Sequence, residues 1–302
     1  MTLDRRALLA LGAGTAMASA LPAQPATRLP FGISLAQWSL HRTIRKGELD
    51  NLDFAGFAKE RFGIGAVEYV NQFFADRATD WQYLAQMKQR ADDHGVRSLL
   101  IMIDGVGALA TTDDEQRRKA IAGHMKWISA AAFLGCHAIR VNAAGSGDRD
   151  ETAARAADSL VQLGMVGDDF GIDVIVENHG GLSSDGSWLA SVMKRANHPR
   201  VGTLPDFGNF KLADGSWYDR YMGVQEMMPF ARAVSAKSHE FDEQGNETKT
   251  DYARMLEIVH KAGYRGHVGI EYEGSKHPEV KGIALTKALL ERVGAGLTVE
   301  PR

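Results

Sequence analysis

The amino-acid sequence predicts one (β/α)8 barrel preceded by an N-terminal export signal. Short apolar runs alternate with longer amphipathic stretches from residue 29 to the end of the chain. The apolar runs begin about 30–40 residues apart, which is the spacing of one strand, one helix and two loops. Several amphipathic stretches end at a glycine, the residue that commonly follows the last turn of a helix. A chain of 302 residues accommodates this fold without a second domain.

Eight apolar runs have the length and composition of buried parallel strands. They lie at 31–38, 66–70, 96–103, 138–142, 172–176, 201–205, 233–237 and 267–270. The run at 172–176 is almost continuously apolar, which is typical of a parallel strand covered by helices. Because one amphipathic stretch follows each run, a closed barrel is favoured over an open doubly wound sheet.

Helices are expected between these strands. Their ranges are 52–61, 80–94, 113–134, 151–170, 188–196, 221–232, 251–262 and 278–293. Gly95, Gly135, Gly171 and Gly263 directly follow four of these ranges and are expected to end the helices in the left-handed conformation. His124, inside the third expected helix, is interpreted as a surface residue.

Residues 1–28 are predicted to form a signal peptide and a short linker. An arginine pair at 5–6 precedes an apolar run at 7–18, and small residues follow. The pattern resembles a twin-arginine signal, although Asp4 before the pair departs from it. Ordinary secretion and an uncleaved N-terminal anchor are the alternatives. The apolar run is shorter than the ~20 residues that span a bilayer, so we expect no stable membrane anchor and a periplasmic or secreted barrel at 29–302.

Composition and missing motifs argue against several functions. With 35 Lys and Arg against 38 Asp and Glu, the formal net charge is −3, so no basic field would hold nucleic acid. The single cysteine, Cys136, cannot form an intramolecular disulfide. A dinucleotide-binding G-x-G-x-x-G after the first strand, a phosphate-binding G-x-x-x-x-G-K-[ST] loop and a G-x-S-x-G elbow are all absent.

Polar residues follow the last four expected strands, at the end where a barrel carries its catalytic groups. Glu177, Asp206, His239 and Glu271 lie at or just beyond these strand ends. Each alone is weak evidence, because an acidic residue after a strand is often a helix cap. Together they predict a site for one divalent metal ion, Mn²⁺, Mg²⁺, Co²⁺ or Zn²⁺, with open positions for paired oxygens of a substrate.

Three motifs around these residues carry a family resemblance. They are ENHGG at 177–181, LPDFGNF at 204–210 and GIEYEG at 269–274. They resemble the xylose isomerase-like TIM-barrel superfamily and, within it, the branch called sugar phosphate isomerase/epimerase proteins. The similarity extends over essentially the whole chain after the leader, beginning with ISLAQWS at 33–39.

The resemblance implies a metal held by Glu177, Asp206, a histidine on the seventh strand and Glu271. It also implies that Glu177 and Glu271 flank the substrate and move protons. A metal that chelates a hydroxyl and the neighbouring carbonyl would stabilise an enediolate, which lowers the cost of removing the α-proton. Further candidates for binding a small carbohydrate are His179, Lys237, Glu68, Asn142 and Trp38. The alternatives are a loop-ordering role for His179, a core position for Trp38, and loop-capping roles for Glu68 and Asn142.

The sequence departs from the family pattern at two positions. Many relatives carry His-x-Lys-Asp on the seventh strand, but here Ser235 has the place of that histidine and His239 lies two residues after Lys237. Because alternate residues of a strand face the same side, His239 is still expected to point into the barrel, one layer of side chains closer to the carboxyl end of the strand. Asn209 replaces a histidine of the endonuclease branch, which disfavours repair of abasic DNA.

Three functions remain open at this stage. The first is a metal-dependent sugar isomerase or epimerase. The second is a metal-dependent lyase or hydratase that acts on keto-sugars or 3-keto-glycosides with the same residues. The third is a sugar-binding barrel without catalysis. The sequence predicts no nucleic-acid partner and leaves open a homo-oligomer.

Overall fold

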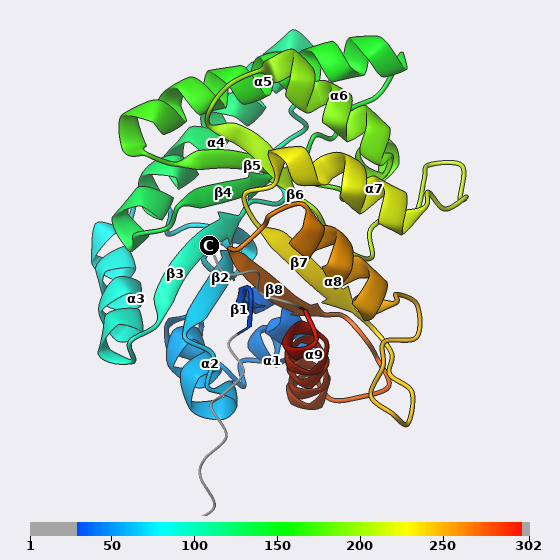
Figure 1. Cartoon of the computed structure of the whole chain (residues 1–302). Coiled ribbons are helices and arrows are strands. Elements are labelled where there is room, and N and C mark those ends of the chain that lie inside the picture. Colours follow the sequence, from blue (N-terminus) through cyan, green and yellow to red (C-terminus); the bar gives the residue numbers. More distant parts are fainter. Residues whose placement is uncertain (1–28, 298–302) are drawn as a thin grey trace, which may run out of the picture.

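The expected apolar runs form a closed parallel barrel in the computed structural model, which describes residues 29–297 (Figure 1). The strand order is β6-β5-β4-β3-β2-β1-β8-β7. The strands are β1 (Gly32–Ala36), β2 (Ala66–Val70), β3 (Arg97–Met102), β4 (Ala138–Val141), β5 (Asp173–Glu177), β6 (Val201–Leu204), β7 (Val234–Ser238) and β8 (His267–Tyr272). The predicted fold class is confirmed.

The strands β6 and β7 close the barrel through a short seam. Two isolated parallel bridges join Thr203 to Ala231 and Asp206 to Ser235. The backbone N–H of Phe207 donates to the carbonyl of Ser235 at 3.1 Å, and the N–H of Ser235 donates to the carbonyl of Pro205 at 2.9 Å. The seam therefore runs from Thr203 within β6 to Asp206 just beyond it, alongside the residues that precede and begin β7.

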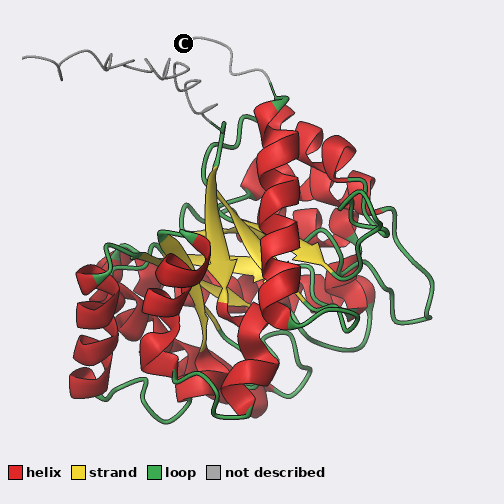
Figure 2. Ribbon diagram, turned by 90° about the horizontal axis from the view of Figure 1, so that it is seen from below, coloured by secondary structure: helices red, strands yellow, loops and turns green. Residues whose placement is uncertain are grey.

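Helices surround the strands, which lie at the centre of the molecule in Figure 2. The helices are α1 (His41–Arg45), α2 (Phe54–Phe62), α3 (Trp81–Asp93), α4 (Asp114–Leu134), α5 (Arg149–Phe170), α6 (Gly186–Ala196), α7 (Arg220–Met227), α8 (Tyr252–Lys261) and α9 (Glu279–Ala295). Aspartates cap six of them by accepting N–H groups of the first turn. Gly135 and Gly171 end α4 and α5 in the left-handed conformation, as predicted.

Two helical details differ from the prediction. The short helix α1 was not expected. The range predicted as one helix at 221–232 divides into α7 and a 3-10 turn, Met228–Phe230. Pro229 has no backbone N–H and so cannot donate to the carbonyl of Gln225, which explains why the α-helical bonding stops there.

Apolar side chains fill both faces of the sheet. Inside the barrel, alternate strand residues such as Val70, Leu100 and Ile175 form one cluster, and a larger cluster lies between strands and helices. The prediction of a surface position for His124 is wrong. Its side chain is buried on α4, where Nδ1 lies 2.7 Å from the carbonyl oxygen of Ala120, and burial lowers its pKa.

The predicted signal peptide and linker at 1–28 lie outside the described residues, as do residues 298–302. Among the helices of the described range, none has the length and apolar character that a membrane crossing requires.

A glycine after β8 sets the spacing of two loops at the end of the barrel. A Cβ atom on Gly274 would lie 1.7 Å from the carbonyl oxygen of His239, after β7. Gly274→Ala should therefore force the two loops apart and destabilise the protein by about 1–3 kcal/mol, measured by urea unfolding. Gly65→Ala is the matched control, because the nearest atom to its Cβ would lie at 3.9 Å. Equal stability of the two variants would contradict this account.

Candidate active site

Three buried carboxylates meet at the carboxyl ends of β5, β6 and β8. Glu177 is the last residue of β5, Asp206 lies two residues after β6, and Glu271 lies near the end of β8. Their side chains are buried, and one oxygen of each lies within 4.8 Å of the others. The structure thus brings together three of the four metal ligands that the sequence predicted.

Asp206 is held by both of its carboxylate oxygens. Oδ1 accepts the backbone N–H groups of Gly208 and Asn209, each at 2.8 Å. Oδ2 lies 2.7 Å from Ser235 Oγ, which also lies 2.9 Å from Glu271 Oε2. A hydroxyl has one proton, so Ser235 donates to one carboxylate at a time, and the other contact requires a shared proton or a cation nearby.

Glu177 is held by Asn209 and by Arg140 of β4. Asn209 Nδ2 donates to Oε1 at 3.0 Å, and Arg140 Nε lies 2.9 Å from Oε2. A second nitrogen of Arg140, Nη1, donates to Asp104 Oδ1 at 2.7 Å. Sequence reasoning missed Arg140. Its position between Ala138 and Asn142, on the same face of β4, was the available signal.

Lys237 supplies the second buried cation of the site. Its Nζ lies 2.8 Å from Glu271 Oε1, 3.1 Å from Glu273 Oε2 and 4.0 Å from Asp206 Oδ2. Burial opposes a charged ammonium group, but these carboxylates outweigh burial and raise the pKa of Lys237 well above its ordinary value. Lys237 therefore stays protonated between the carboxylates.

Negative charge still exceeds positive charge around this group. Burial raises the pKa of Glu177, Arg140 lowers it, Glu271 raises it further, and the net shift is upward. The pKa of Asp206 is also raised, chiefly by burial. Three closely spaced carboxylates in such a field fit a hard divalent cation. Glu177, Asp206 and Glu271 are the residues that would hold it.

The structure does not bring His239 into the carboxylate group. The pairing of β7 ends at Ser238, so the two-residue alternation no longer determines where His239 points. Its backbone N–H donates to Glu247 Oε1 at 3.2 Å, and its side chain is half-buried. Ser235 and Lys237, which lie within β7, face the carboxylates instead.

Besides Lys237, two of the predicted sugar-binding residues, Trp38 and Asn142, lie near the acidic group. Trp38 follows β1 in a 3-10 turn, Gln37–Leu40, and its indole N–H donates to Glu273 Oε1. Its ring is half-exposed and stacks on His41 with 4.8 Å between the centroids. Asn142 Nδ2 donates to Asp104 Oδ1 at 2.8 Å, the oxygen that Arg140 also contacts.

The other two candidates, His179 and Glu68, lie within electrostatic range of the same group. Desolvation, Arg140 and Lys237 lower the pKa of His179. Burial, Glu271 and Glu177 raise the pKa of Glu68. His179 is exposed two residues after β5, and its backbone N–H donates to Ser183 Oγ at 2.9 Å. Glu68 is buried in the middle of β2 and accepts a hydrogen bond from Ser34 Oγ at 2.6 Å. Gly269 has no side chain, and the carboxylate of Glu68 occupies the space that its Cβ would need.

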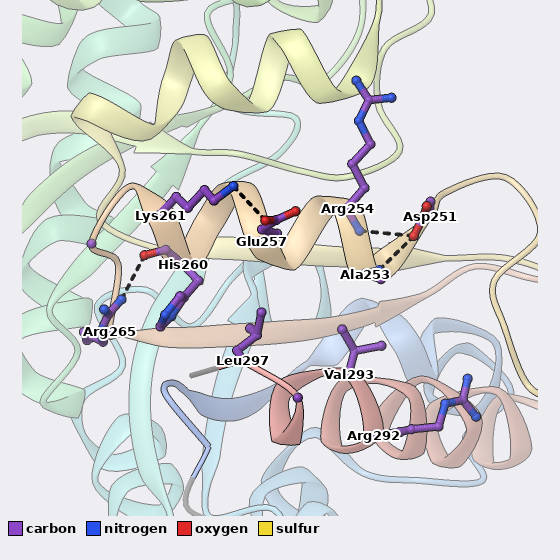
Figure 3. Close-up of a pocket in the computed structure, with 12 residues that line it drawn as sticks. Asp251, Ala253, Arg254, Glu257, His260, Lys261, Arg265, Arg292, Val293 and Leu297 are labelled. Carbon is purple, nitrogen blue, oxygen red and sulfur yellow. Dashed lines mark hydrogen bonds and ion pairs between the residues drawn. The ribbon is translucent and has the colours of Figure 1, made fainter. Parts of the chain in front are cut away.

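A large cavity of about 1020 Å³ lies away from the carboxylates, on the outside of the barrel between α8 and α9 (Figure 3). Arg254 and Glu257 of α8 and Arg292 of α9 are among its lining residues. It contains none of the three clustered carboxylates, so its size does not make it the candidate site.

A family model described as xylose isomerase-like TIM barrel matches residues 57–292. The chain belongs to this family. All three clustered carboxylates of this xylose isomerase-like barrel fall inside the matched range, as the motifs around them predicted. No curated protein shows significant sequence similarity to the chain.

Solved structures share the fold of this xylose isomerase-like barrel at low sequence identity. A sugar phosphate isomerase/epimerase from Parabacteroides distasonis ATCC 8503 is 14% identical, with a TM-score of 0.68 over 89% of this chain and 98% of that chain. A 3-keto-D-glucoside 4-epimerase from E. coli is 13% identical, with a TM-score of 0.65 over 88% of this chain and 100% of that chain. The IOLI protein with a bound zinc atom is 12% identical, with a TM-score of 0.69 over 88% of this chain and 99% of that chain.

Mn²⁺ should stabilise the protein through the three carboxylates. A cation at about 100 times its Kd adds about 2.7 kcal/mol, which raises Tm by about 5–10 °C for a domain of this size. Asp206→Asn should remove most of this shift and weaken Mn²⁺ binding measured by calorimetry. Asp113→Asn is the control, because it changes an exposed helix cap of α4. Unchanged Mn²⁺ affinity of Asp206→Asn would exclude this metal site.

Glu68 should make stability depend on pH. Burial raises its pKa from 4.5 to about 7, and Oε2 has no hydrogen-bond partner among the described residues. The folded protein binds the proton of Glu68 more tightly than the unfolded chain does. The resulting stabilisation is fully present below the pKa of the unfolded chain, 4.5, and is lost as pH rises through the folded pKa of about 7. Between pH 4.5 and 8, wild type should lose about 3 kcal/mol relative to Glu68→Gln.

This difference is measured by urea unfolding in the presence of EDTA, so that no metal contributes. Glu48→Gln removes an exposed carboxylate and serves as the control. Its stability should follow that of wild type at each pH. A constant difference between wild type and Glu68→Gln across this pH range would contradict the assignment.

Proposed function

We propose that the protein is a divalent-metal-dependent sugar isomerase or epimerase that moves a proton on the carbon next to a carbonyl. The observation that carries this proposal is the group of three buried carboxylates, Glu177, Asp206 and Glu271, within 4.8 Å at the ends of three strands. The family supports a carbohydrate substrate, since two structures of the same fold are named as sugar isomerases or epimerases. Another holds zinc.

A bound divalent cation would supply Lewis-acid polarisation of the substrate carbonyl. The chain supplies the groups that move the proton. Glu177 and Glu271 come from β5 and β8, with β6 and β7 between them in the closed barrel. Each carboxylate reaches the same point from its own strand, and we assign one to remove the proton and the other to return it.

Arg140 and Lys237 position these two carboxylates. Arg140 is fixed by Asp104 and lies 2.9 Å from Glu177 Oε2, while Lys237 lies 2.8 Å from Glu271 Oε1. Each glutamate therefore keeps one orientation although its charge is buried. This preorganisation lowers the cost of orienting the acid and the base during the reaction.

Trp38 and Asn142 would orient the sugar. The half-exposed indole of Trp38 is fixed through its N–H by Glu273 and offers an apolar face to a sugar ring. Asn142 is half-buried beside Asp104 and offers an amide to a hydroxyl group. Both side chains are held by carboxylates before substrate binds, so their rotamers need little reordering.

Loss of either proton-moving glutamate should abolish turnover. In the metal-loaded protein, Glu177→Gln and Glu271→Gln should each lower kcat by about 10²–10⁴-fold. Turnover is followed by deuterium exchange at the α-carbon of aldoses, ketoses and 3-keto-glycosides in D₂O. Glu151→Gln, an exposed change on α5, is the control and should keep full activity.

The same measurement separates the other functions. Release of an aglycone from a 3-keto-glycoside, together with exchange, would replace the isomerase with a lyase. Sugar binding without any exchange would leave a non-catalytic binding barrel. Wild-type turnover in both glutamine variants would overturn the mechanism.

A further inference from the structure

A second cavity, opposite in charge to the carboxylate group, lies between the loops that follow β5, β6 and β7. Its volume is about 160 Å³, far above the ~15 Å³ that one water needs. Four basic side chains line it, Lys211 and Arg220 after β6 and His239 and Lys249 after β7, and no carboxylate is among the lining residues. Sequence reasoning missed this cavity.

The cavity adjoins the carboxylate group through Gly208 and Asn209. Both residues line the cavity, and both donate backbone N–H groups to Asp206 Oδ1. Asn209 Nδ2 also donates to Glu177 Oε1. A small molecule that reacts at the carboxylates thus has the cavity next to it, separated only by the turn at 208–209.

Three of the four basic side chains, Lys211, Arg220 and Lys249, form no salt bridge to a carboxylate among residues 29–297, while Glu273 and Glu247 act electrostatically on His239. Lys211 and Lys249 are exposed. Arg220 Nη1 donates to two neutral acceptors, Thr250 Oγ1 at 2.6 Å and the carbonyl of Phe207 at 3.3 Å. The guanidinium group is therefore fixed in place while its charge remains available to a ligand.

Two short hairpins hold the basic residues. Lys211 pairs with Trp217 in an antiparallel bridge, and Phe241 pairs with Glu247 in another. The two hairpins follow β6 and β7 and extend from the same side of the barrel in Figure 1. The loop that carries Lys211 also carries the exposed indole of Trp217 on the cavity wall.

Glu247 fixes the second hairpin from inside. Its buried carboxylate accepts backbone N–H groups of His239 at 3.2 Å through Oε1 and of Lys249 and Thr250 at 2.6 Å through Oε2. Both oxygens are engaged by the backbone. The side chains of His239 and Lys249 remain directed to the cavity that they line.

We propose that this cavity binds an oxyanion substituent of the substrate, a phosphate, carboxylate or sulfate group, so that the substrate is an acidic carbohydrate. This assignment rests on the proposed function for the reacting end of the molecule. Lys211, Arg220 and Lys249 supply positive charge to the cavity, which suits an oxyanion. The planar guanidinium group of Arg220 can bind two oxygens. Trp217 provides an apolar surface beside it.

Oxyanion binding is tested on the full chain without any turnover. Calorimetry at low ionic strength measures the Kd of inorganic phosphate, sulfate and acetate for wild type and for Lys211→Gln/Lys249→Gln. We expect at least a tenfold weaker Kd in the double variant for the preferred anion. Lys88→Gln/Lys119→Gln has the same net charge and changes exposed lysines of α3 and α4 instead. It should bind as wild type does.

Kinetics then connects the cavity to the substrate. For a sugar that carries the preferred anion, the double variant should raise KM at least tenfold with kcat nearly unchanged, and a neutral sugar should show no change. The anion with the lowest Kd identifies the substituent. Equal anion Kd values in the double variant and in the control double variant would overturn the proposal.

The outcomes also separate this inference from the proposed function. Anion binding that depends on the two lysines, without proton exchange on any sugar, would keep the oxyanion site and remove the isomerase. Proton exchange on neutral sugars, with anion binding unaffected by the lysines, would keep the isomerase and remove the oxyanion site.

Discussion

Two buried cations allow three carboxylates to share one end of the barrel. An ionised carboxylate in a protein interior is costly unless it is paired and hydrogen-bonded. Arg140 balances Glu177, and Lys237 balances Glu271, while Asp206 takes two backbone N–H groups from the turn that follows it. Removing either cation would leave uncompensated negative charge, so the geometry of the site depends on these two residues.

The site and the closure of the barrel share residues. Asp206 forms a backbone bridge to Ser235, and its carboxylate contacts the Ser235 hydroxyl. The seam between β6 and β7 therefore lies where the acidic group lies. A change that opens the seam would move Asp206 away from Glu177 and Glu271, and a change in the acidic group would act on the seam.

The sequence predicted those parts of the molecule that follow from periodicity. Each expected strand overlaps the observed one, and β2 has the predicted bounds, because apolar runs covered by helices leave a clear pattern. The positions of Glu177, Asp206 and Glu271 followed from the rule that strand ends share one mouth. These predictions require only that the strands be parallel and consecutive.

Features that depend on side-chain direction beyond a strand were not predictable in this way. His239 lies one residue past β7, where alternation no longer applies, and it faces the loop cavity instead of the carboxylates. Arg140 lies within β4 on the same face as Asn142, so its inward direction could have been predicted, but its pairing with Glu177 and Asp104 could not. The basic cavity needs the shapes of two hairpins, which local composition does not determine.

Glu247 has a consequence for how this barrel can diversify. Its carboxylate bonds to backbone N–H groups alone, so it supports the loop whatever side chains stand at positions 239 and 249. Single substitutions at these positions could alter which chemical group is accepted without unfolding the loop. The support of this loop and the side chains that it presents to the cavity therefore depend on different residues.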